Sequence, residues 1–361
     1  MKTTPIIQTI TPEFFDALLI PPDIAPESTL THAFNPRIIN FLSAYLHTPS
    51  WYIVLFRSNS PIALLPLVRR GKNYFSLPHF SYGGIHWLNQ IHPSRESLMT
   101  FVTNLLHQTK SPSGFYRVDL AENILSSDQS NVSYTPRIQI RTTTPVFKLT
   151  TPTKAVYWMT LKKDPRQKIA AFSSNLRRKI KASGRKGVEV TIGGVELLND
   201  FMPIYRQNLH RLGSPALGLD FFSALLKSCK KEEATLAIAY HQGQPIGGGL
   251  WLSYRGFREN THFATLPKHN HLYTSYALHW AMIQHAQGRG DHTYSFGRST
   301  IGSTVEKFKT QWPVEVHPLY YNSTCPIVNR ITSKTWLSKI WKYLPSFLVN
   351  AIGPSIAKRI Y

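Results

Sequence analysis

The side chains best suited to chemistry lie between Asp291 and Tyr320. Alternation of polar and apolar residues from His292 to Phe296 predicts a strand that opens into a loop and a helix. The candidates at the end of this strand and beyond it are Ser295, Gly297, Arg298, Ser299, Lys307 and Lys309. Because α/β proteins usually bind ligands at the ends of sheet strands, a guanidinium, hydroxyls and backbone N–H groups here suit an anionic or carbonyl-bearing ligand. An ordinary strand, turn and helix is the alternative interpretation.

A second candidate cluster precedes the helix predicted over His271–Gln287. It contains Asn270, His271, Tyr273 and Tyr276. An imidazole can move protons near neutral pH, and a tyrosine hydroxyl can donate to an oxyanion or a leaving amine. Packing in the core explains the two tyrosines equally well. No third ligand accompanies the His-x-His pair, so we predict no metal site.

The segment Lys162–Lys186 contains ten basic residues and one acid, Asp164. We predict an amphipathic helix that Asp164 caps and Gly184 ends. Its apolar face is formed by Ile169, Phe172, Leu176 and Ile180. The basic residues best placed for phosphate oxygens are Arg177, Arg178 and Lys181. A solvated face that only improves solubility is the alternative.

Two predicted hairpins suggest that one fold occurs twice. The run FRSNSPIALL, from Phe56 to Leu65, aligns with YHQGQPIGGG, from Tyr240 to Gly249, at an offset of 184 residues. Each is an apolar strand that ends in an aromatic and a basic residue, then three turn residues, Pro-Ile and a second strand. Chance similarity between two hairpins is the alternative.

Several of these stretches carry a resemblance. YSFGRST, the later FK, Trp312 and LYY resemble the C-terminal signature of FemAB-like proteins of the GNAT acyltransferase superfamily, above all the branch associated with exopolysaccharide and exosortase gene clusters. LPLVRR with LPHFSYGG, SNLRRKIKASGRKGVEV and YRQNLHRLGSPAL also agree with that branch. Three positions depart from the pattern: Ser295 replaces Asp, and Thr304 and Pro313 replace Gly. An acid or base role of the missing Asp does not transfer to Ser295.

The resemblance implies an α/β (α+β) fold of two tandem GNAT-like domains, each a mixed, mostly antiparallel sheet flanked by helices. We expect these domains at residues 1–150 and 151–325, followed by a basic amphipathic tail at 326–361. The implied activity is transfer of an acyl or aminoacyl group to form an amide or ester on a cell-envelope or exopolysaccharide precursor. The donor would be a co-substrate, acyl-CoA or aminoacyl-tRNA, with no tightly bound cofactor. LPKHNHLYTSY has no glycine where GNAT enzymes hold CoA pyrophosphate, which resembles the tRNA-dependent Fem transferases.

This activity assigns a role to each candidate. Arg298, Lys307 and Lys309 would hold anionic groups, Ser299 and backbone N–H groups near Gly297 would donate to the carbonyl oxygen, and Tyr273 or His271 would handle the proton. The remaining substrate-binding candidates are Asn270, Tyr276, Ser295, Arg177, Arg178 and Lys181. Two other functions fit the sequence: a non-catalytic tRNA- or RNA-binding protein on the same scaffold, and a peripheral membrane component of a polymer-export complex.

Composition limits the partners and the location. Lys and Arg outnumber Asp and Glu 41 to 19 over 361 residues, a net charge of +22, so anionic partners such as tRNA, CoA esters or lipid are expected. Cys229 and Cys325 are too few for a disulfide framework, and no segment resembles a signal peptide or a membrane span. The expected location is the cytoplasm, with the inner face of the cytoplasmic membrane as an alternative. The tail mixes tryptophans with lysines and suits either an anionic membrane or the protein's own core.

Overall fold

The computed structural model describes residues 6–10, 31–57, 60–70, 73–81, 83, 86–87, 115–120, 148–149, 153–161, 166–323 and 335–360. The chain divides into two compact units. Unit 1 comprises Met1–Val156 and His317–Ile327, and unit 2 comprises Tyr157–Val316 and Val328–Tyr361. Each unit is described by itself below.

Unit 1 is a mixed sheet with one described α-helix. Its elements are β1 (Ile6–Ile10), η1 (His32–Phe34), α2 (Pro36–Leu46), β2 (Ser50–Arg57), β3 (Ser60–Arg70), β4 (Asn73–Phe75), β5 (His86–Trp87), β6 (Phe115–Leu120), β7 (Lys148–Leu149) and most of β14 (Glu315–Ser323). Strands β1 to β4 pair antiparallel in sequence order, β6 lies parallel to β4, and β14 pairs antiparallel with β6 and β7. The side chain of Asn35 caps α2, which starts at Pro36.

Unit 2 has a six-stranded sheet. Most of β8 (Lys154–Thr160) belongs to it, with β9 (Val188–Gly193), β10 (Ala234–His241), β11 (Gln244–Tyr254), β12 (Phe257–Thr265) and β13 (Thr293–Thr300), in the spatial order β8-β13-β12-β11-β10-β9. Its helices are α5 (Arg166–Ala171), α6 (Ser174–Arg185), η2 (Val195–Leu197), α7 (Leu198–Leu212), α8 (Leu219–Ser228), η3 (Pro267–Leu272), α9 (Thr274–Gly288), α10 (Thr304–Lys309), α11 (Thr335–Tyr343) and α12 (Ser346–Ile360). Pairing is antiparallel from β9 to β12 and parallel between β12 and β13.

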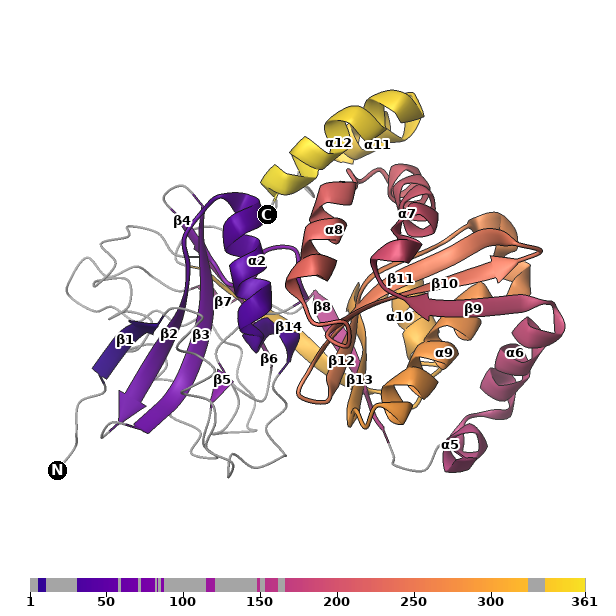
Figure 1. The fold of residues 1–361 in the computed structure, drawn as a ribbon, viewed down its shortest axis with the longest axis horizontal. Helices are drawn as coiled ribbons and strands as arrows, with labels where there is room; N and C mark the ends of the chain where they lie inside the picture. Colours follow the sequence, from indigo (N-terminus) through magenta and orange to yellow (C-terminus); the bar gives the residue numbers. More distant parts are fainter. Residues whose placement is uncertain are drawn as a thin grey trace. The chain divides into compact units, whose positions relative to one another are not determined.

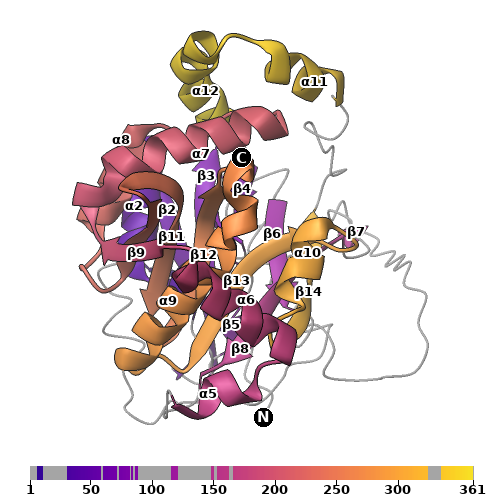
Figure 2. The same cartoon turned by 90° about the vertical axis from the view of Figure 1, so that its right-hand side faces the viewer.

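Consecutive glycines in β11 let helices approach both faces of this sheet. A Cβ on Gly247 would lie 2.7 Å from Thr274 of α9, and one on Gly248 would lie 3.1 Å from Phe201 of α7. Because successive residues of a strand point to opposite faces, α9 covers one face and α7 the other. Helix α6 packs beside α9, and α8 beside α7 (Figures 1 and 2).

The two units repeat the same hairpins. When 184 is added to the residue numbers of the hairpin β2–β3, its residue pairs coincide with those of the hairpin β10–β11, and both hairpins have a bulge at the same position. The equivalent pairs are Leu55–Ala63 and Ala239–Gly247, Phe56–Pro61 and Tyr240–Pro245, and Arg70–Asn73 and Tyr254–Phe257. In both units the strand beyond this meander is parallel to its neighbour. The predicted duplication and the predicted α/β fold class, with a mixed sheet in each unit, are therefore confirmed.

The copies diverge after β4. The offset would place Ser81 opposite Ala63, whereas Trp87 occupies that position, so unit 1 has six extra residues between β4 and β5. These residues include part of the LPHFSYGG run. The strand pairing of the two units thus locates an insertion in unit 1 that the hydrophobicity pattern of the sequence does not reveal.

Three predicted boundaries in unit 2 are wrong. The predicted basic helix is broken at Phe172 and Ser173, and Ser173 caps the second part, α6. Gly184 was predicted to end the helix, but α6 continues to Arg185, and the glycine with a positive φ, +75°, is Gly187. His271 lies in η3, because Tyr273 adopts a left-handed conformation and α9 begins at Thr274. Strand β13 continues through Arg298 and Ser299 to Thr300, so these residues belong to a strand and not to a loop. Asp164 and the helix predicted over Ser94–Lys110 lie outside the described residues.

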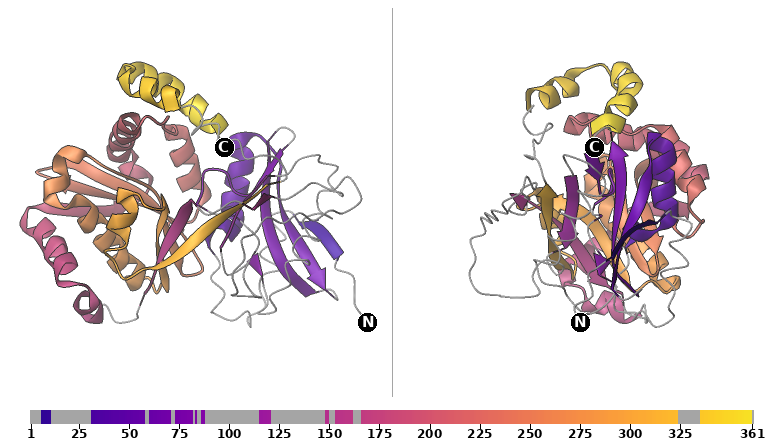
Figure 3. Two further views of the ribbon diagram at one scale, coloured as in Figure 1. Left: turned by 180° about the vertical axis from the view of Figure 1, so that it is seen from behind. Right: turned by 90° about the vertical axis from the view of Figure 1, so that its left-hand side faces the viewer.

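The C-terminal helices α11 and α12 pack on the outer side of α7 (Figure 3). Within the part of the chain that the structure describes, the search for a helix long and apolar enough to cross a bilayer finds none.

Candidate functional site

The strands β12 and β13 separate after a short parallel pairing, and the candidate site forms there. They pair from Phe257 with Thr293 to Glu259 with Ser295. Beyond this point Gly297, at φ +71°, passes so close to the carbonyl oxygen of Asn260 that a Cβ would lie 2.2 Å from it. Only glycine fits that backbone. In α/β folds, ligands usually bind near the carboxyl ends of the strands, which is where these two strands part.

We define the β12–β13 site by the residues that contact one another around this divergence: Tyr157, Glu259, Asn260, Ser295, Gly297, Arg298, Ser299, Glu306 and Lys309.

Lys309 is the central charge of the site. It is 5% exposed, its ammonium donates to the carbonyl oxygen of Gly297 at 2.7 Å, and it lies 5.2 Å from the ring centre of Tyr157. Burial lowers the pKa of Lys309 to about 7, with the charge of Glu259 opposing the shift and that of Arg298 adding to it. The side chain can therefore change its charge near neutral pH.

Ser295 connects Glu259 to the bend at Gly297. Its hydroxyl donates to the fully buried carboxylate of Glu259 at 3.1 Å and accepts from the N–H of Gly297 at 3.2 Å. The N–H of Gly297 is thus already engaged, contrary to the expectation that it would donate to a substrate carbonyl. An Asp at position 295, as in the similar family, would place two carboxylates side by side.

Several polar atoms in the site, among them Oγ of Ser299, lack a hydrogen-bond partner among the described residues. Two of them are Nη1 of Arg298, on a half-buried side chain, and Oδ1 of Asn260, on a side chain that is 7% exposed. Buried polar groups in folded proteins are almost always hydrogen-bonded, and an orphaned one is destabilising. A polar ligand between the two strands would satisfy both atoms.

The turn that leads into α10 is fixed by Glu306. Its carboxylate accepts from the hydroxyl of Tyr157 at 2.8 Å and from the N–H of Gly302, while Ser303 caps the helix through the N–H of Glu306. Burial raises the pKa of Tyr157 to about 12, and the neighbouring carboxylate of Glu306 adds to the shift. The phenol is therefore protonated at neutral pH. It links the turn to β8 through Glu306, and the ammonium of Lys309 lies over its ring.

Sequence reasoning overlooked four members of this site: Tyr157, Glu259, Asn260 and Glu306. The S-x-x-E spacing of Ser303 and Glu306 is a capping-box signal that could have identified Glu306. The other three lie on strands that read as ordinary buried segments, and only the sheet order brings them to Arg298 and Lys309.

The predicted cluster before α9 contacts the basic helix instead. Lys179 donates to the hydroxyl of Tyr276 at 3.0 Å and to Gln311, which also accepts from Tyr276. Lys186 donates to the carbonyl oxygen of His271 and lies 5.5 Å from the ring centre of Tyr273. Two lysines one heptad apart thus anchor α6 to these tyrosines and to His271.

The remaining predicted residues lie on exposed surfaces. Arg177 donates to the carbonyl oxygen of Ala170, Arg178 donates to Asn175, and Lys181 is exposed on the same helix. Asn270 and Lys307 are exposed as well. The structure therefore groups Ser295, Gly297, Arg298, Ser299 and Lys309, and separates them from the exposed basic residues of α6.

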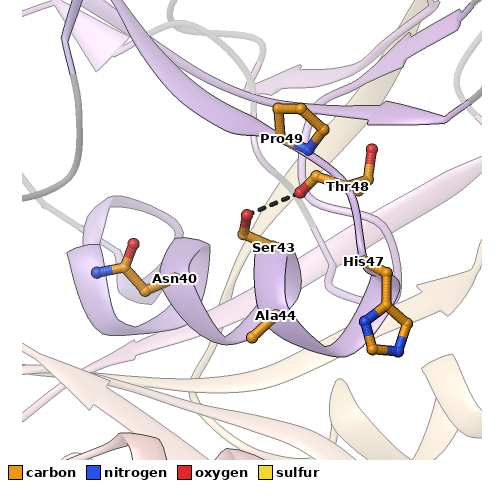
Figure 4. A pocket seen from close by; sticks show the side chains of 6 residues that line it. All are labelled: Asn40, Ser43, Ala44, His47, Thr48 and Pro49. Atoms are coloured by element: carbon orange, nitrogen blue, oxygen red, sulfur yellow. Dashed lines mark hydrogen bonds between the residues drawn. The ribbon is translucent and has the colours of Figure 1, made fainter.

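Unit 1 contains a shallow hollow at the end of α2 (Figure 4). Inside the hollow, the hydroxyl of Ser43 donates to the carbonyl oxygen of Thr48 at 2.7 Å. The lining residues are Asn40, Ser43, Ala44, His47, Thr48 and Pro49. This lining offers neither a charge cluster nor an activated nucleophile, so the β12–β13 site is the stronger candidate.

Comparisons with known proteins agree with this geometry. Residues 170–310 match the family model described as an acetyltransferase (GNAT) domain. No curated protein sequence matches the chain. The solved structure of FemX is similar with a TM-score of 0.60 at 11% identity, over 88% of this chain and 96% of FemX.

Two further structures share the fold. L-PGS from Bacillus licheniformis has a TM-score of 0.51 at 13% identity, over 92% of this chain and 97% of its own. A conserved protein of unknown function from Bacteroides thetaiotaomicron VPI-5482 has a TM-score of 0.51 at 11% identity, over 89% and 99%. At such identities these likenesses establish the fold alone. Residues 170–310 therefore contain a domain similar to the GNAT acetyltransferase family, which supports a transferase, and the chain shares the fold of FemX.

Proposed function

We propose that the protein is an acyl or aminoacyl transferase that forms an amide or ester on a cell-envelope or exopolysaccharide precursor. The observation that carries this proposal is the pair of cationic side chains beside the divergence of β12 and β13, the buried Lys309 and the half-buried Arg298, in a domain similar to GNAT acetyltransferases. The fold shared with FemX supports the same class of chemistry.

In this reaction an amine or hydroxyl of the acceptor attacks the activated carbonyl carbon of the donor. A C–N or C–O bond forms, the C–S or C–O bond to the donor's carrier breaks, and the proton of the nucleophile ends on the leaving group. Arg298 and Lys309 stabilise negative charge, and the hydroxyl of Ser299 donates to the carbonyl oxygen. Lys307 would guide anionic groups from the exposed face of α10.

Two groups of candidates remain for the proton. Tyr273 and His271 lie at the start of α9, with Asn270 and Tyr276 as substrate contacts there. Lys309 is a rival, because a lysine with a pKa near 7 can act as a base in its neutral form. The pH dependence of kcat/KM separates them: a rise through pH 7 that Lys309→Gln abolishes assigns the base role to Lys309.

We propose aminoacyl-tRNA as the donor in preference to acyl-CoA. Residues Pro267–Leu272 form a 3-10 helix without a glycine, so this connection lacks the closely approachable backbone that cradles a pyrophosphate. The exposed arginines of α6 supply positive charge suited to a polyanion.

Incubation with a panel of charged tRNAs and acyl-CoAs, with loss of the activated carboxyl as the readout, tests this proposal. Arg298→Ala should lower kcat/KM at least ~100-fold by removing a charge at the developing oxyanion. Arg289→Ala, at the exposed end of α9, is the matched control. Unchanged turnover in Arg298→Ala contradicts the assignment.

An RNA-binding protein without transferase activity is the second candidate function. It is favoured by α6, on which Arg178 and Lys181 are exposed and Arg177 is partly exposed. No acidic residue lies between Lys168 and Gly187. Titration of labelled tRNA at several salt concentrations tests it. Tight, salt-sensitive binding without loss of the activated carboxyl favours this candidate over the enzyme.

A peripheral membrane protein at the inner face of the cytoplasmic membrane is the third candidate. It depends on the C-terminal helices.

A further inference from the structure

Helix α12 is apolar on two neighbouring faces, of which only one is buried. The buried face is a stripe of small residues four positions apart, Val349, Gly353 and Ala357. A Cβ on Gly353 would lie 3.6 Å from the backbone of Ala216, and Trp341 of α11 is buried beside it. These small residues let α11 and α12 approach the segment between α7 and α8. The buried face of α12 therefore already packs on the rest of unit 2.

The larger apolar side chains lie on the neighbouring face, about 100° around the helix axis. In α12, Leu348, Ile352 and Ile356 repeat every four residues and are 40%, 44% and 37% exposed. Phe347 and Tyr343 are 71% and 88% exposed where the two helices meet. With Ile340, this face holds six of the twelve large hydrophobic residues exposed in the described part of the chain, all within 17 positions. A contiguous row of this kind is typical of an interaction surface.

The charge around this face is of one sign. Residues 326–361 contain six basic residues and no acid. Lys339, Lys342 and Arg359 are exposed on the two helices. A second copy of the same face would bring like charges together, which disfavours self-association. An anionic lipid surface matches both the apolar row and the cations, because its headgroups attract lysines while its acyl boundary accepts large apolar side chains.

We propose that the exposed face of α11 and α12, made of Ile340, Tyr343, Phe347, Leu348, Ile352 and Ile356, binds the surface of an anionic phospholipid bilayer. The helices lie in the plane of the interface, and their small-residue stripe holds unit 2 to it. The inference concerns binding only and does not depend on the transfer chemistry.

Co-sedimentation with lipid vesicles tests this proposal on the full chain. We expect binding to phosphatidylcholine vesicles that contain phosphatidylglycerol, little binding to phosphatidylcholine alone, and partial release at high salt. The triple variant Phe347→Ser, Leu348→Ser and Ile352→Ser should bind at least ~10-fold more weakly, because three large side chains no longer enter the interface. All three are exposed, so the fold should persist, as circular dichroism will show.

The matched control replaces equally exposed residues elsewhere, Val195→Ser with Val316→Ser, which are 47% and 46% exposed. This control should bind as the parent does. Lys339→Gln with Lys342→Gln should reduce the preference for anionic vesicles about tenfold and leave binding to neutral vesicles unchanged. The proposal is overturned if the parent chain ignores anionic vesicles, if the triple variant binds them equally, or if sedimentation analysis shows that the triple variant instead dissociates a dimer.

Discussion

Ser295 determines how many negative charges the β12–β13 site contains. It hydrogen-bonds the fully buried Glu259, so Ser295→Asp would set a second carboxylate within about 3 Å of the first. Repulsion and burial would raise the folded-state pKa of one of the two above its unfolded value. The penalty is therefore complete at pH 8 and shrinks as the pH falls through the raised pKa. We expect Ser295→Asp to lose ~2–4 kcal/mol of unfolding free energy at pH 8 and less at pH 5, in urea titrations.

Ser295→Ala is the control for this change, since it removes the two hydrogen bonds without adding charge. It should lose about 1–2 kcal/mol at both pH values. Equal stability of the Asp and Ala variants at pH 8 would show that Lys309 neutralises the added carboxylate.

Lys309 makes anion binding dependent on pH. Burial lowers its pKa to about 7, so about half of the Lys309 side chains carry a charge near neutral pH when no ligand is bound. A bound anion favours the ammonium form, and affinity should therefore be highest below pH 7 and fall by up to ~10-fold for each pH unit above it. Binding of a competitive anionic donor analogue between pH 6 and 8.5 measures this effect. Lys309→Gln should flatten the profile, and a profile that stays steep would assign the titration to another group.

At the scale of elements, the break between α5 and α6 is a specific feature and not a frayed helix. Ser173 accepts from the N–H of Leu176 and starts a new helix, whereas the apolar spacing alone predicts one continuous helix. Ser173→Ala should lower the free energy of unfolding by ~1 kcal/mol through loss of this cap. Ser174→Ala, one position further on and equally exposed, should change it by less than about 0.5 kcal/mol in the same denaturant titration.

The same comparison shows which elements sequence can define. The hairpins were predictable, because alternation and turn residues are local, and the repeat at 184 residues even gave their register. Contacts that depend on sheet order were not. Tyr157 and Lys309 are 152 positions apart, and no local pattern marks a tyrosine in β8 as the neighbour of a lysine in α10. Ser295 and Arg298 were found because a motif contains them, whereas Glu259 is hidden in an ordinary strand.

For the whole molecule, the chain path makes unit 1 discontinuous. Most of strand β14 lies between the two segments of unit 2 in sequence, yet it pairs with β6 inside unit 1, from Leu319 with Leu120 to Ser323 with Phe115. A fragment of residues 1–156 therefore lacks the partner of β6 and leaves that strand's hydrogen-bonding edge open. We expect this fragment to aggregate and to unfold without a cooperative transition.

Restoring the strand should reverse that defect. Residues 1–156 joined by a flexible Gly/Ser linker to residues 315–327 contain every strand of unit 1, so the fusion should be monomeric and unfold cooperatively in urea. The control carries the same segment with Leu319→Lys, which puts a charge at a fully buried position of β14 and should abolish the rescue. If the fragment without β14 already unfolds cooperatively, or if the charged control is rescued equally, then β14 does not complete the fold of unit 1.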